Sequence, residues 1–353
     1  MSVHSAPECL TWIAARVDAR IDVLLRTESK RWADLDADLP ELIDAIDALV
    51  FAGGKRLRPA FCHWAFVGAG GDPDDPAVVD AGAALELLHT IALIHDDVMD
   101  GSHRRRGRST VHRSFEARHA VADWRGEGRR FGEGVAILVG DLAFVYADLL
   151  LSAAPRPALD VFTELRLEVN VGQYLDLLGT VRGEVTVEQA RRISLYKSGK
   201  YTIERPLHLG AALAGRLDDL APALSAFGRP LGEAFQLRDD LLGAFGDAEV
   251  TGKPVGEDLR EGKPTALYAF AAATADGAAA KLLADRFGAP DLTAGEVAEL
   301  QAILEETGAR REVERTIGRR LDEALAALDR APLERRAGAR LAELAHFVAG
   351  RDH

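Results

Sequence analysis

The residues most able to do chemistry lie between positions 85 and 112, where an apolar segment ends in three carboxylates and gives way to arginines. In a helix, residues four apart share a face, so Asp96 and Asp100 point the same way and Asp97 is offset by one position. Mg²⁺ takes one or two protein carboxylates and completes its shell with water and phosphate oxygens. Because the helix dipole opposes acid at a C-terminus, we prefer a hard-cation site to a merely solvated acidic turn.

A second acidic pair, Asp239 and Asp240, occurs in the segment FQLRDDLLG. Gln236 precedes Asp239 by three residues and therefore shares its helix face. Gly243 stands where a third carboxylate would complete the spacing of the first cluster. An isolated Asp-Asp pair is commonly only solvated, but two such pairs in one chain strengthen the prediction of a metal centre.

Lysines and arginines recur in short groups along the chain. These are Lys55, Arg56, Arg58, Arg105, Arg106, Lys197, Lys200, Lys253 and Lys263. Metal-bound carboxylates and separate cationic groups are what two diphosphate ligands require, since arginine forks and lysine charges neutralise the phosphate oxygens that the metals leave exposed. The P-loop string GxxxxGK[ST] does not occur, which disfavours nucleotide chemistry of that type.

The elements that must position these side chains are predicted to be helices. No segment shows sustained apolar-polar alternation between turn signals, so strands should be scarce and about a dozen helices should form. Capping boxes at Thr186/Gln189 and Thr293/Glu296 predict helix starts, and the glycine-rich stretch 125–134 predicts a break. No internal repeat or linker divides the 353 residues, so we expect one domain, 1–353.

Composition and charge exclude several classes of protein. The chain is 48% hydrophobic and 28% charged, as in folded proteins, and its net charge of −13 disfavours nucleic-acid binding, despite the arginine-rich stretch 104–130. The apolar runs at 135–139 and 142–151 are too short to cross a bilayer, so we expect no membrane span. Two cysteines and no signal-peptide core in residues 1–30 favour the cytoplasm.

The order of motifs resembles that of a known family. Between residues 53 and 265 the chain carries GGKRLRP, LELLHT, DDVMD, RRG, GQYLD, YKSGKYT, FQLRDD and paired GK segments. This order resembles the trans-isoprenyl diphosphate synthases of the polyprenyl synthetase family, especially actinobacterial geranylgeranyl and farnesyl diphosphate synthases. The resemblance implies an all-α bundle around a central apolar cavity, of the isoprenoid synthase type, and a homodimer.

The resemblance also implies roles for individual residues. Asp96 and Asp100 would hold two Mg²⁺ ions and Asp239 a third, with Mn²⁺ as a possible substitute, while Asp97 and Asp240 would support them through water. The implied allylic-diphosphate contacts are Arg105, Lys197, Lys253 and Lys263; the isopentenyl-diphosphate contacts are Lys55, Arg58, His89 and Arg106; and Gln236 and Ser198 would face the developing cation. The family usually has threonine at the place of Ser198 and aspartate at that of Gly243. Two alternatives stay open: His89 as a core histidine, and Gln173 with Asp176 as caps or bridges between helices.

The implied reaction is head-to-tail condensation of isopentenyl diphosphate with dimethylallyl, geranyl or farnesyl diphosphate. The allylic carbon–oxygen bond ionises, the isopentenyl double bond attacks the cation, and a proton is lost, with the released diphosphate as the expected acceptor. Ile91 and Ala92 lie one turn before Asp96, and Leu88 lies one turn further. In the family that the chain resembles, synthases that stop at fifteen carbons carry an aromatic residue here, and since none of these three is aromatic the resemblance implies a geranylgeranyl product. The alternatives are a farnesyl or longer-chain synthase, a class I terpene cyclase and a non-catalytic synthase subunit.

Overall fold

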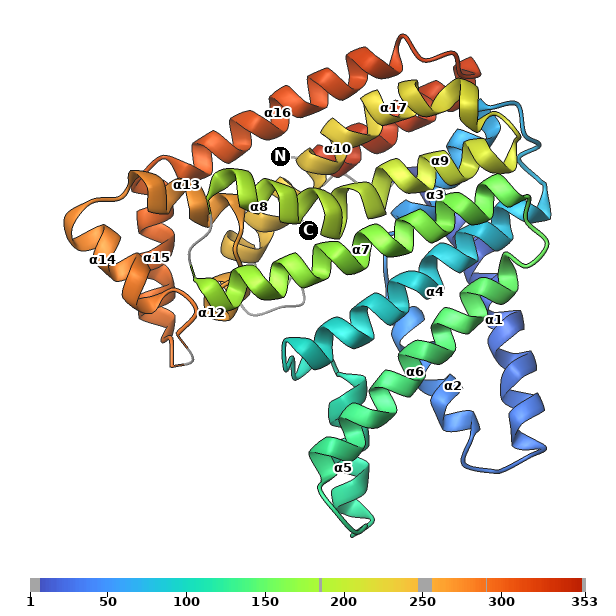
Figure 1. Cartoon of the computed structure of the whole chain (residues 1–353), viewed down its shortest axis with the longest axis horizontal. Helices are drawn as coiled ribbons and strands as arrows, with labels where there is room; N and C mark the ends of the chain where they lie inside the picture. The colour runs from blue at the N-terminus through green and yellow to red at the C-terminus, as the bar shows by residue number, and fades with distance from the viewer. Residues whose placement is uncertain (1–6, 184–185, 247–255, 290, 351–353) are drawn as a thin grey trace. The chain divides into compact units, whose positions relative to one another are not determined.

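The computed structural model describes residues 7–183, 186–246, 256–289 and 291–350. Almost every described element is helical, which confirms the all-α prediction (Figure 1). The elements are α1 (Glu8–Ala33), α2 (Pro40–Val50), α3 (Leu57–Gly68), α4 (Pro76–Met99), β1 (Arg104–Arg105), β2 (Arg108–Ser109), α5 (Val111–Val121), α6 (Gly128–Leu150), α7 (Arg156–Arg182), α8 (Val187–Ser194), the π-helix η1 (Leu195–Glu204), α9 (Arg205–Leu213), α10 (Leu217–Phe245), α12 (Glu257–Glu261), α13 (Ala266–Thr274), α14 (Gly277–Arg286), α15 (Ala294–Glu306), α16 (Ala309–Leu328) and α17 (Arg335–Gly350).

The described residues form two compact units. The first contains Glu8–His63 and Asp72–Pro155, and the second contains Trp64–Gly71 and the described part of Arg156–His353. In the first unit α4 packs against α1, α2 and α6, and in the second α10 packs against η1, α9, α16 and α17. The single domain 1–353 stays a prediction.

Helix α4 positions the first acidic cluster. Asp75 caps its N-terminus by accepting a hydrogen bond from the Ala77 amide at 2.8 Å, and Pro76 occupies the first turn, where the lack of an amide proton costs nothing. Apolar and small residues then predominate, and the middle of the helix is buried on nearly every side, Glu86 and Thr90 included. The helix ends at Met99, with Asp100 as its C-cap, before a glycine, Gly101, with φ of +65°.

The same helix bears on the question of a membrane span. Within the described residues, only α4 is long and apolar enough to cross a membrane by length and composition. The apolar runs 135–139 and 142–151, from which no membrane span was predicted, both lie outside α4. The most apolar window of α4 is 61% buried inside the structure, and the core helix of a soluble protein passes the same test.

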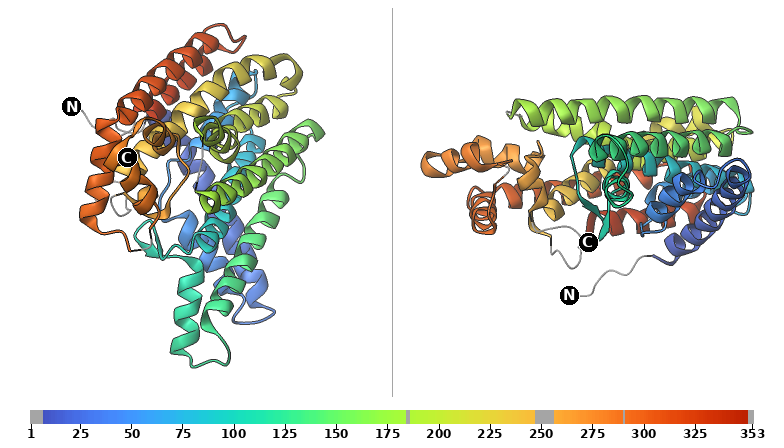
Figure 2. Two further views of the ribbon diagram at one scale, coloured as in Figure 1. Left: turned by 60° about the vertical axis from the view of Figure 1, so that its left-hand side comes forward. Right: turned by 90° about the horizontal axis from the view of Figure 1, so that it is seen from below.

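Long helices carry the functional segments of the second unit. Helix α7 has 27 residues and packs along η1 and α9. It is drawn as one unbroken helix in both views of Figure 2. Helix α10 runs for 29 residues and carries Asp239 and Asp240 in its last two turns. The predicted capping boxes Thr186/Gln189 and Thr293/Glu296 are both confirmed at the starts of α8 and α15.

The break predicted in the glycine-rich stretch 125–134 is confirmed at residues 125–127, which lie between α5 and α6, but it was wrong for the rest, because α6 begins at Gly128 and continues through it. A side chain on Gly132 would overlap the backbone oxygen of His112, and one on Gly128 would lie 3.2 Å from His119 Nδ1. These glycines therefore allow α5 and α6 to pack closely, and they do not end a helix.

Candidate active site

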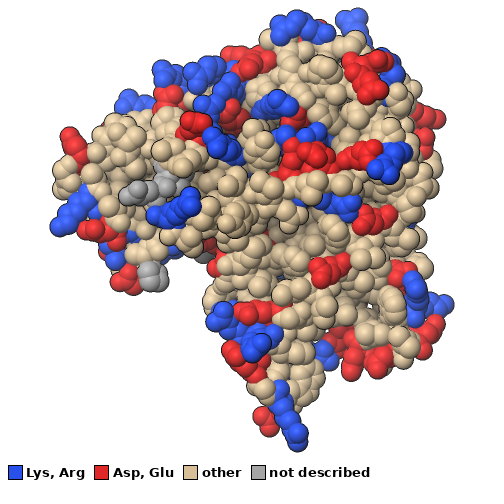
Figure 3. Space-filling view, in the orientation of Figure 1, with Lys and Arg blue, Asp and Glu red and all other residues tan. Residues whose placement is uncertain are grey.

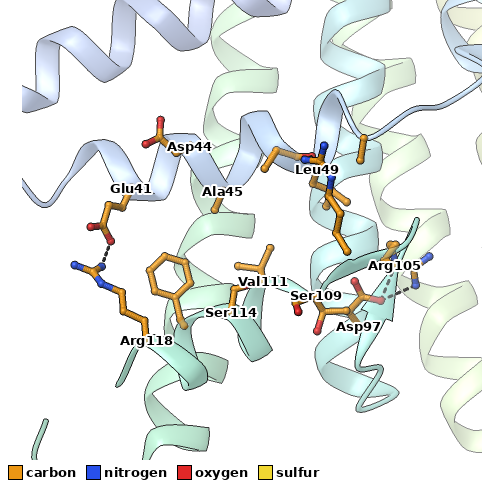
Figure 4. Close-up of a pocket in the computed structure, with 15 residues that line it drawn as sticks. Glu41, Asp44, Ala45, Leu49, Asp97, Arg105, Ser109, Val111, Ser114 and Arg118 are labelled. Atoms are coloured by element: carbon orange, nitrogen blue, oxygen red, sulfur yellow. Dashed lines mark hydrogen bonds and ion pairs between the residues drawn. The ribbon is translucent and has the colours of Figure 1, made fainter. Parts of the chain in front are cut away.

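The end of α4 carries the three carboxylates of the first cluster. Asp96 and Asp100 are partly buried, whereas Asp97 is only 2% exposed. Both Nε and Nη2 of Arg105 lie 2.7 Å from Asp97 Oδ1 (Figure 4). Nη2 also lies 3.7 Å from Asp96 Oδ2. Asp97 therefore orients Arg105 beside the pair predicted to bind metal, which is a positioning role that the sequence did not indicate.

A short hairpin brings Arg105 back to the acidic helix end. Strands β1 and β2 pair antiparallel, with Arg105 opposite Arg108. Between them Arg106 and Gly107 have φ angles of +50° and +75°, and positive φ at both central residues is typical of the type I′ turn that joins two-residue hairpins. The hairpin thus supplies cationic side chains where the helix dipole leaves the carboxylates least stabilised.

His89, on α4, lies in a basic environment. Burial lowers the pKa of His89 well below its usual value, and the positive charges of Arg58, Arg106, Arg105 and Arg56 lower it further. His89 is therefore neutral near pH 7 among arginines. Three of the residues predicted for isopentenyl diphosphate, namely Arg58, His89 and Arg106, are electrostatically coupled within one unit.

Arg56 belongs to the same motif but has a structural task. Its Nε lies 2.7 Å from Asp18 Oδ1, its Nη1 lies 3.0 Å from Glu86 Oε2, and its Nη2 donates to the Val50 carbonyl at 2.8 Å. The buried guanidinium thereby fixes the loop that carries Lys55, which is partly buried. Arg106 donates to the backbone oxygens of Leu49, at 3.3 Å, and of Gly53.

A cavity of about 330 Å³ lies between α2, the hairpin and α5. Its wall includes Asp97 and Arg105 together with apolar residues such as Leu49, Val111 and Phe115 (Figure 4). Along α4, Leu88 is buried and Ile91 and Ala92 are partly buried.

In the second unit, the YKSGKYT motif forms the π-helix η1, a form of helix that frequently occurs at functional sites. Lys197 Nζ donates to Asp176 Oδ2 at 2.6 Å, so Asp176 bridges α7 and η1, one of the two alternatives left open for it. Lys200 is buried and pairs with Glu168. Ser198 is partly buried between these two lysines.

The two residues of the second acidic pair, Asp239 and Asp240, differ in burial and in hydrogen bonding. Asp239 is exposed, whereas Asp240 is 4% exposed and accepts a hydrogen bond from Gln236 Nε2 at 2.8 Å. Burial, with contributions from the charges of Asp258 and Asp239, raises the pKa of Asp240 to about 8. The amide of Gln236 is thus hydrogen-bonded to Asp240, although its spacing had suggested a partnership with Asp239.

Helix α12 contributes further charges. Lys263 Nζ lies 3.5 Å from Asp258 Oδ1 and 2.5 Å from Glu261 Oε2. Lys253, predicted to contact the allylic diphosphate, lies outside the described residues. The sequence did not predict Asp258 as a site residue, although its carboxylate belongs to the group of charges around Asp240.

The described part of the chain holds no group of three or more His, Cys, Asp or Glu side chains that could bind a metal by themselves. The acidic end of α4 nevertheless fits Mg²⁺, because Asp96 and Asp100 are hard oxygen donors one turn apart, and this ion takes its remaining ligands from water and substrate phosphates. Neither cluster resembles a cage built from protein alone.

This helical fold, with acidic helix ends and separate cationic groups, defines the isoprenoid synthase class. The chain belongs to the polyprenyl synthetase family, whose model matches residues 39–305. It is similar to a geranylgeranyl diphosphate synthase of Mycobacterium tuberculosis, with 37% identity over 78% of this chain and 75% of that one, and to a farnesyl diphosphate synthase of Mycobacterium bovis, with 32% identity over 84% and 80%. A solved geranylgeranyl pyrophosphate synthase from Corynebacterium glutamicum, complexed with isoprenyl diphosphate and magnesium, superposes with a TM-score of 0.91 at 37% identity, covering 97% of this chain and 99% of that one.

These likenesses establish that the chain is a prenyltransferase that elongates prenyl diphosphates. They do not distinguish its product, because relatives of comparable similarity carry geranylgeranyl and farnesyl names.

Proposed function

We propose that this prenyltransferase condenses isopentenyl diphosphate with allylic diphosphates to give the twenty-carbon geranylgeranyl diphosphate. The observation that carries the product length is the wall of α4 before Asp96, where Leu88, Ile91 and Ala92 include no aromatic side chain. Four residues of helix span about 6 Å, close to one isoprene unit, so a tail directed along this face meets no bulky ring within two turns. The central apolar cavity of the family is the space proposed to hold that tail.

The allylic diphosphate and its metal ions are proposed to take their ligands from the acidic clusters and the cationic residues. Asp96 and Asp100 would hold two Mg²⁺ ions and Asp239 a third, with Mn²⁺ able to replace them. When bound, these cations act as Lewis acids that stabilise the departing diphosphate. The chain's own contacts to the same group are proposed to be Arg105, Lys197, Lys253 and Lys263.

Isopentenyl diphosphate is proposed to bind at the basic residues of the first unit, Lys55, Arg58, His89 and Arg106. The coupling of His89 to Arg58 and Arg106 supports this proposal, because a neutral imidazole can donate a hydrogen bond to phosphate without adding repulsion within the arginine group. The residues Ser198 and Gln236 would face the developing cation, and the released diphosphate would accept the proton that is lost. No protein nucleophile takes part.

We further propose that the enzyme is a single-domain cytoplasmic homodimer that binds no nucleic acid. On the face shown in Figure 3, basic and acidic side chains alternate, and they form no continuous basic surface there. Helices α6 and α7 each expose a row of large apolar residues that suits contact with a second copy of the chain. These are Leu138, Val145 and Leu149 on α6, and Leu167, Val171, Tyr174 and Val181 on α7.

The test of product length incubates the enzyme with isopentenyl diphosphate, Mg²⁺ and each allylic diphosphate in turn, followed by chromatography of the dephosphorylated products. A dominant twenty-carbon alcohol is expected from all three starters. A dominant fifteen-carbon product, or one beyond twenty-five carbons, would contradict the assignment.

The test of the metal residues compares Asp96→Ala and Asp239→Ala with the unmodified enzyme. Each variant should lose several orders of magnitude in turnover with the fold intact by circular dichroism, because each loses a ligand to an ion that stabilises the leaving group. Near-normal turnover of either variant would show that its carboxylate does not bind the metal.

A further inference from the structure

Gly243 lies one helical turn after Asp239 and three residues after Asp240, on the face of α10 that carries both carboxylates. A Cβ atom at Gly243 would overlap the carboxylate of Asp258, whose Oδ2, Cγ and Oδ1 are the three atoms nearest to it. The space where a side chain at position 243 would begin is therefore filled by a carboxylate from α12.

At the other glycines of the same unit, the contacts shorter than 3.0 Å are with backbone atoms or with apolar side chains, such as Phe66 at Gly71 and Val297 at Gly256. Gly199 and Gly232 meet through backbone atoms, as do Gly262 and Gly288, so those glycines allow two segments of backbone to approach each other. At Gly243 the neighbouring atoms all belong to one charged side-chain group. Close packing of helices alone would not require an ionisable group at this point.

The position also reproduces the spacing of the first cluster. Asp96 and Asp100 lie four residues apart on α4, and Asp239 and Gly243 lie four residues apart on α10. Asp258 occupies the place of a side chain at position 243. Its carboxylate therefore takes the position next to Asp239 that the carboxylate of Asp100 takes next to Asp96. The group around it is crowded with negative charge, which Lys263, at 3.5 Å from Asp258 Oδ1, offsets in part.

We propose that Asp258 supplies, from α12, the second carboxylate of the Asp239 cation site, and that Gly243 is required because it leaves room for this carboxylate. The inference rests on the proposed function, in which Asp239 faces a divalent cation. A cation held jointly by α10 and α12 would tie the two helices together, so its binding should stabilise α12.

The test measures Mg²⁺ binding by titration calorimetry in the presence of inorganic diphosphate, and amide hydrogen exchange of residues 256–262 with and without both. Asp258→Asn keeps the size of the side chain and removes its charge. It should weaken Mg²⁺ binding by about 10-fold to 100-fold, as loss of a supporting ligand typically does, and abolish the Mg²⁺-dependent protection of α12. Glu257→Gln, a matched change on the same short helix, should leave both measurements near those of the unmodified enzyme.

A reciprocal exchange gives the sharper result. Gly243→Asp alone should impair Mg²⁺ binding, because the new side chain overlaps Asp258. The double variant Gly243→Asp/Asp258→Gly should bind Mg²⁺ at least 10-fold more tightly than either Gly243→Asp or Asp258→Gly alone. Unchanged binding and protection in Asp258→Asn, or no recovery in the double variant, would overturn the proposal.

The two proposals fail in different ways. If the unmodified enzyme elongates prenyl diphosphates with Mg²⁺ and Asp239→Ala abolishes turnover while Asp258→Asn matches the unmodified enzyme, only the role of Asp258 is wrong. If Asp239→Ala is itself without effect on Mg²⁺ binding, the α10 metal site fails and the role of Asp258 fails with it.

Discussion

At the scale of single residues, the uncharged state of its imidazole explains why a histidine can lie among four arginines. The lowered pKa of His89 keeps the imidazole neutral in the folded protein, so it adds no fifth positive charge to Arg56, Arg58, Arg105 and Arg106. A neutral histidine donates one hydrogen bond, and a neutral amide side chain can do the same. This comparison separates the role of His89 as a donor from a role as a base.

We therefore expect His89→Gln to retain most isopentenyl diphosphate binding, whereas His89→Ala and Arg58→Ala should each weaken it. Lys197→Ala should act mainly on the allylic substrate. Loss of a charge-assisted contact costs about 1.5 to 3 kcal/mol, or about 10-fold to 150-fold in affinity. Steady-state constants for both substrates check the division, and equal changes for the two substrates in Arg58→Ala and Lys197→Ala would contradict it.

The residue types of the site were predictable from the sequence, but several partnerships were not. Asp96 and Asp100 are found by helical spacing, because local geometry alone places residues four apart on one face, and Asp239 is found because it lies in a second acidic pair. The pairing of Asp97 with Arg105 depends on a hairpin, and that of Gln236 with Asp240 depends on which face is buried. The approach of Asp258 to Gly243 joins two segments of the chain, and no local pattern indicates such a contact.

At the scale of elements, capping signals and apolar continuity predicted the helices well. The boxes at Thr186 and Thr293 start helices because their side chains and the third residue satisfy each other's amides, a purely local effect. The π-helix at Leu195–Glu204 was not predicted, since its sequence has no signal that separates it from an α-helix. The glycines of α6 were misread because glycine both breaks helices and allows them to pack closely.

The two roles of glycine can be separated by experiment on α6. Gly132→Ala should destabilise the protein by about 1–3 kcal/mol, because the added methyl overlaps the backbone of α5. Gly134→Ala, on the same helix with open space around it, should instead stabilise by up to about 1 kcal/mol through helix propensity. Denaturant unfolding of both variants checks this, and a gain in stability at Gly132 would refute the packing explanation.

Product length is likewise a property of an element, the wall of α4. Replacing Ile91 or Ala92 with Phe should shorten the main product by at least one five-carbon unit, since the ring would obstruct a tail that passes along this face. Ionisation should continue, because the predicted metal ligands are unchanged. Chromatography of the products measures the effect, and an unchanged distribution in both variants would show that the tail takes another path.

At the scale of the whole molecule, the exposed rows on α6 and α7 make a prediction about assembly. The double variant Leu167→Glu/Val171→Glu should convert the proposed homodimer to a monomer, because two charges replace apolar residues that are each more than half exposed. Val23→Glu on α1 is a matched control, since Val23 is similarly exposed. Light scattering coupled to size exclusion gives the masses, and a dimeric double variant would place the interface elsewhere.

The backbone of the basic group has a consequence for engineering. Among the described non-glycine residues, only Arg56, Arg106 and Asp123 have positive φ, and two of these three belong to the group around His89. A left-handed backbone costs free energy for a residue with a Cβ, and it persists where the surroundings impose it. A search for thermostable variants would gain from glycine at Asp123 without touching the proposed site. The same substitution at Arg106 would relieve strain by discarding a guanidinium proposed to bind substrate, so at that position heat resistance and catalysis oppose each other. At Arg56 it would leave the buried Glu86 carboxylate without its partner and would destabilise the fold.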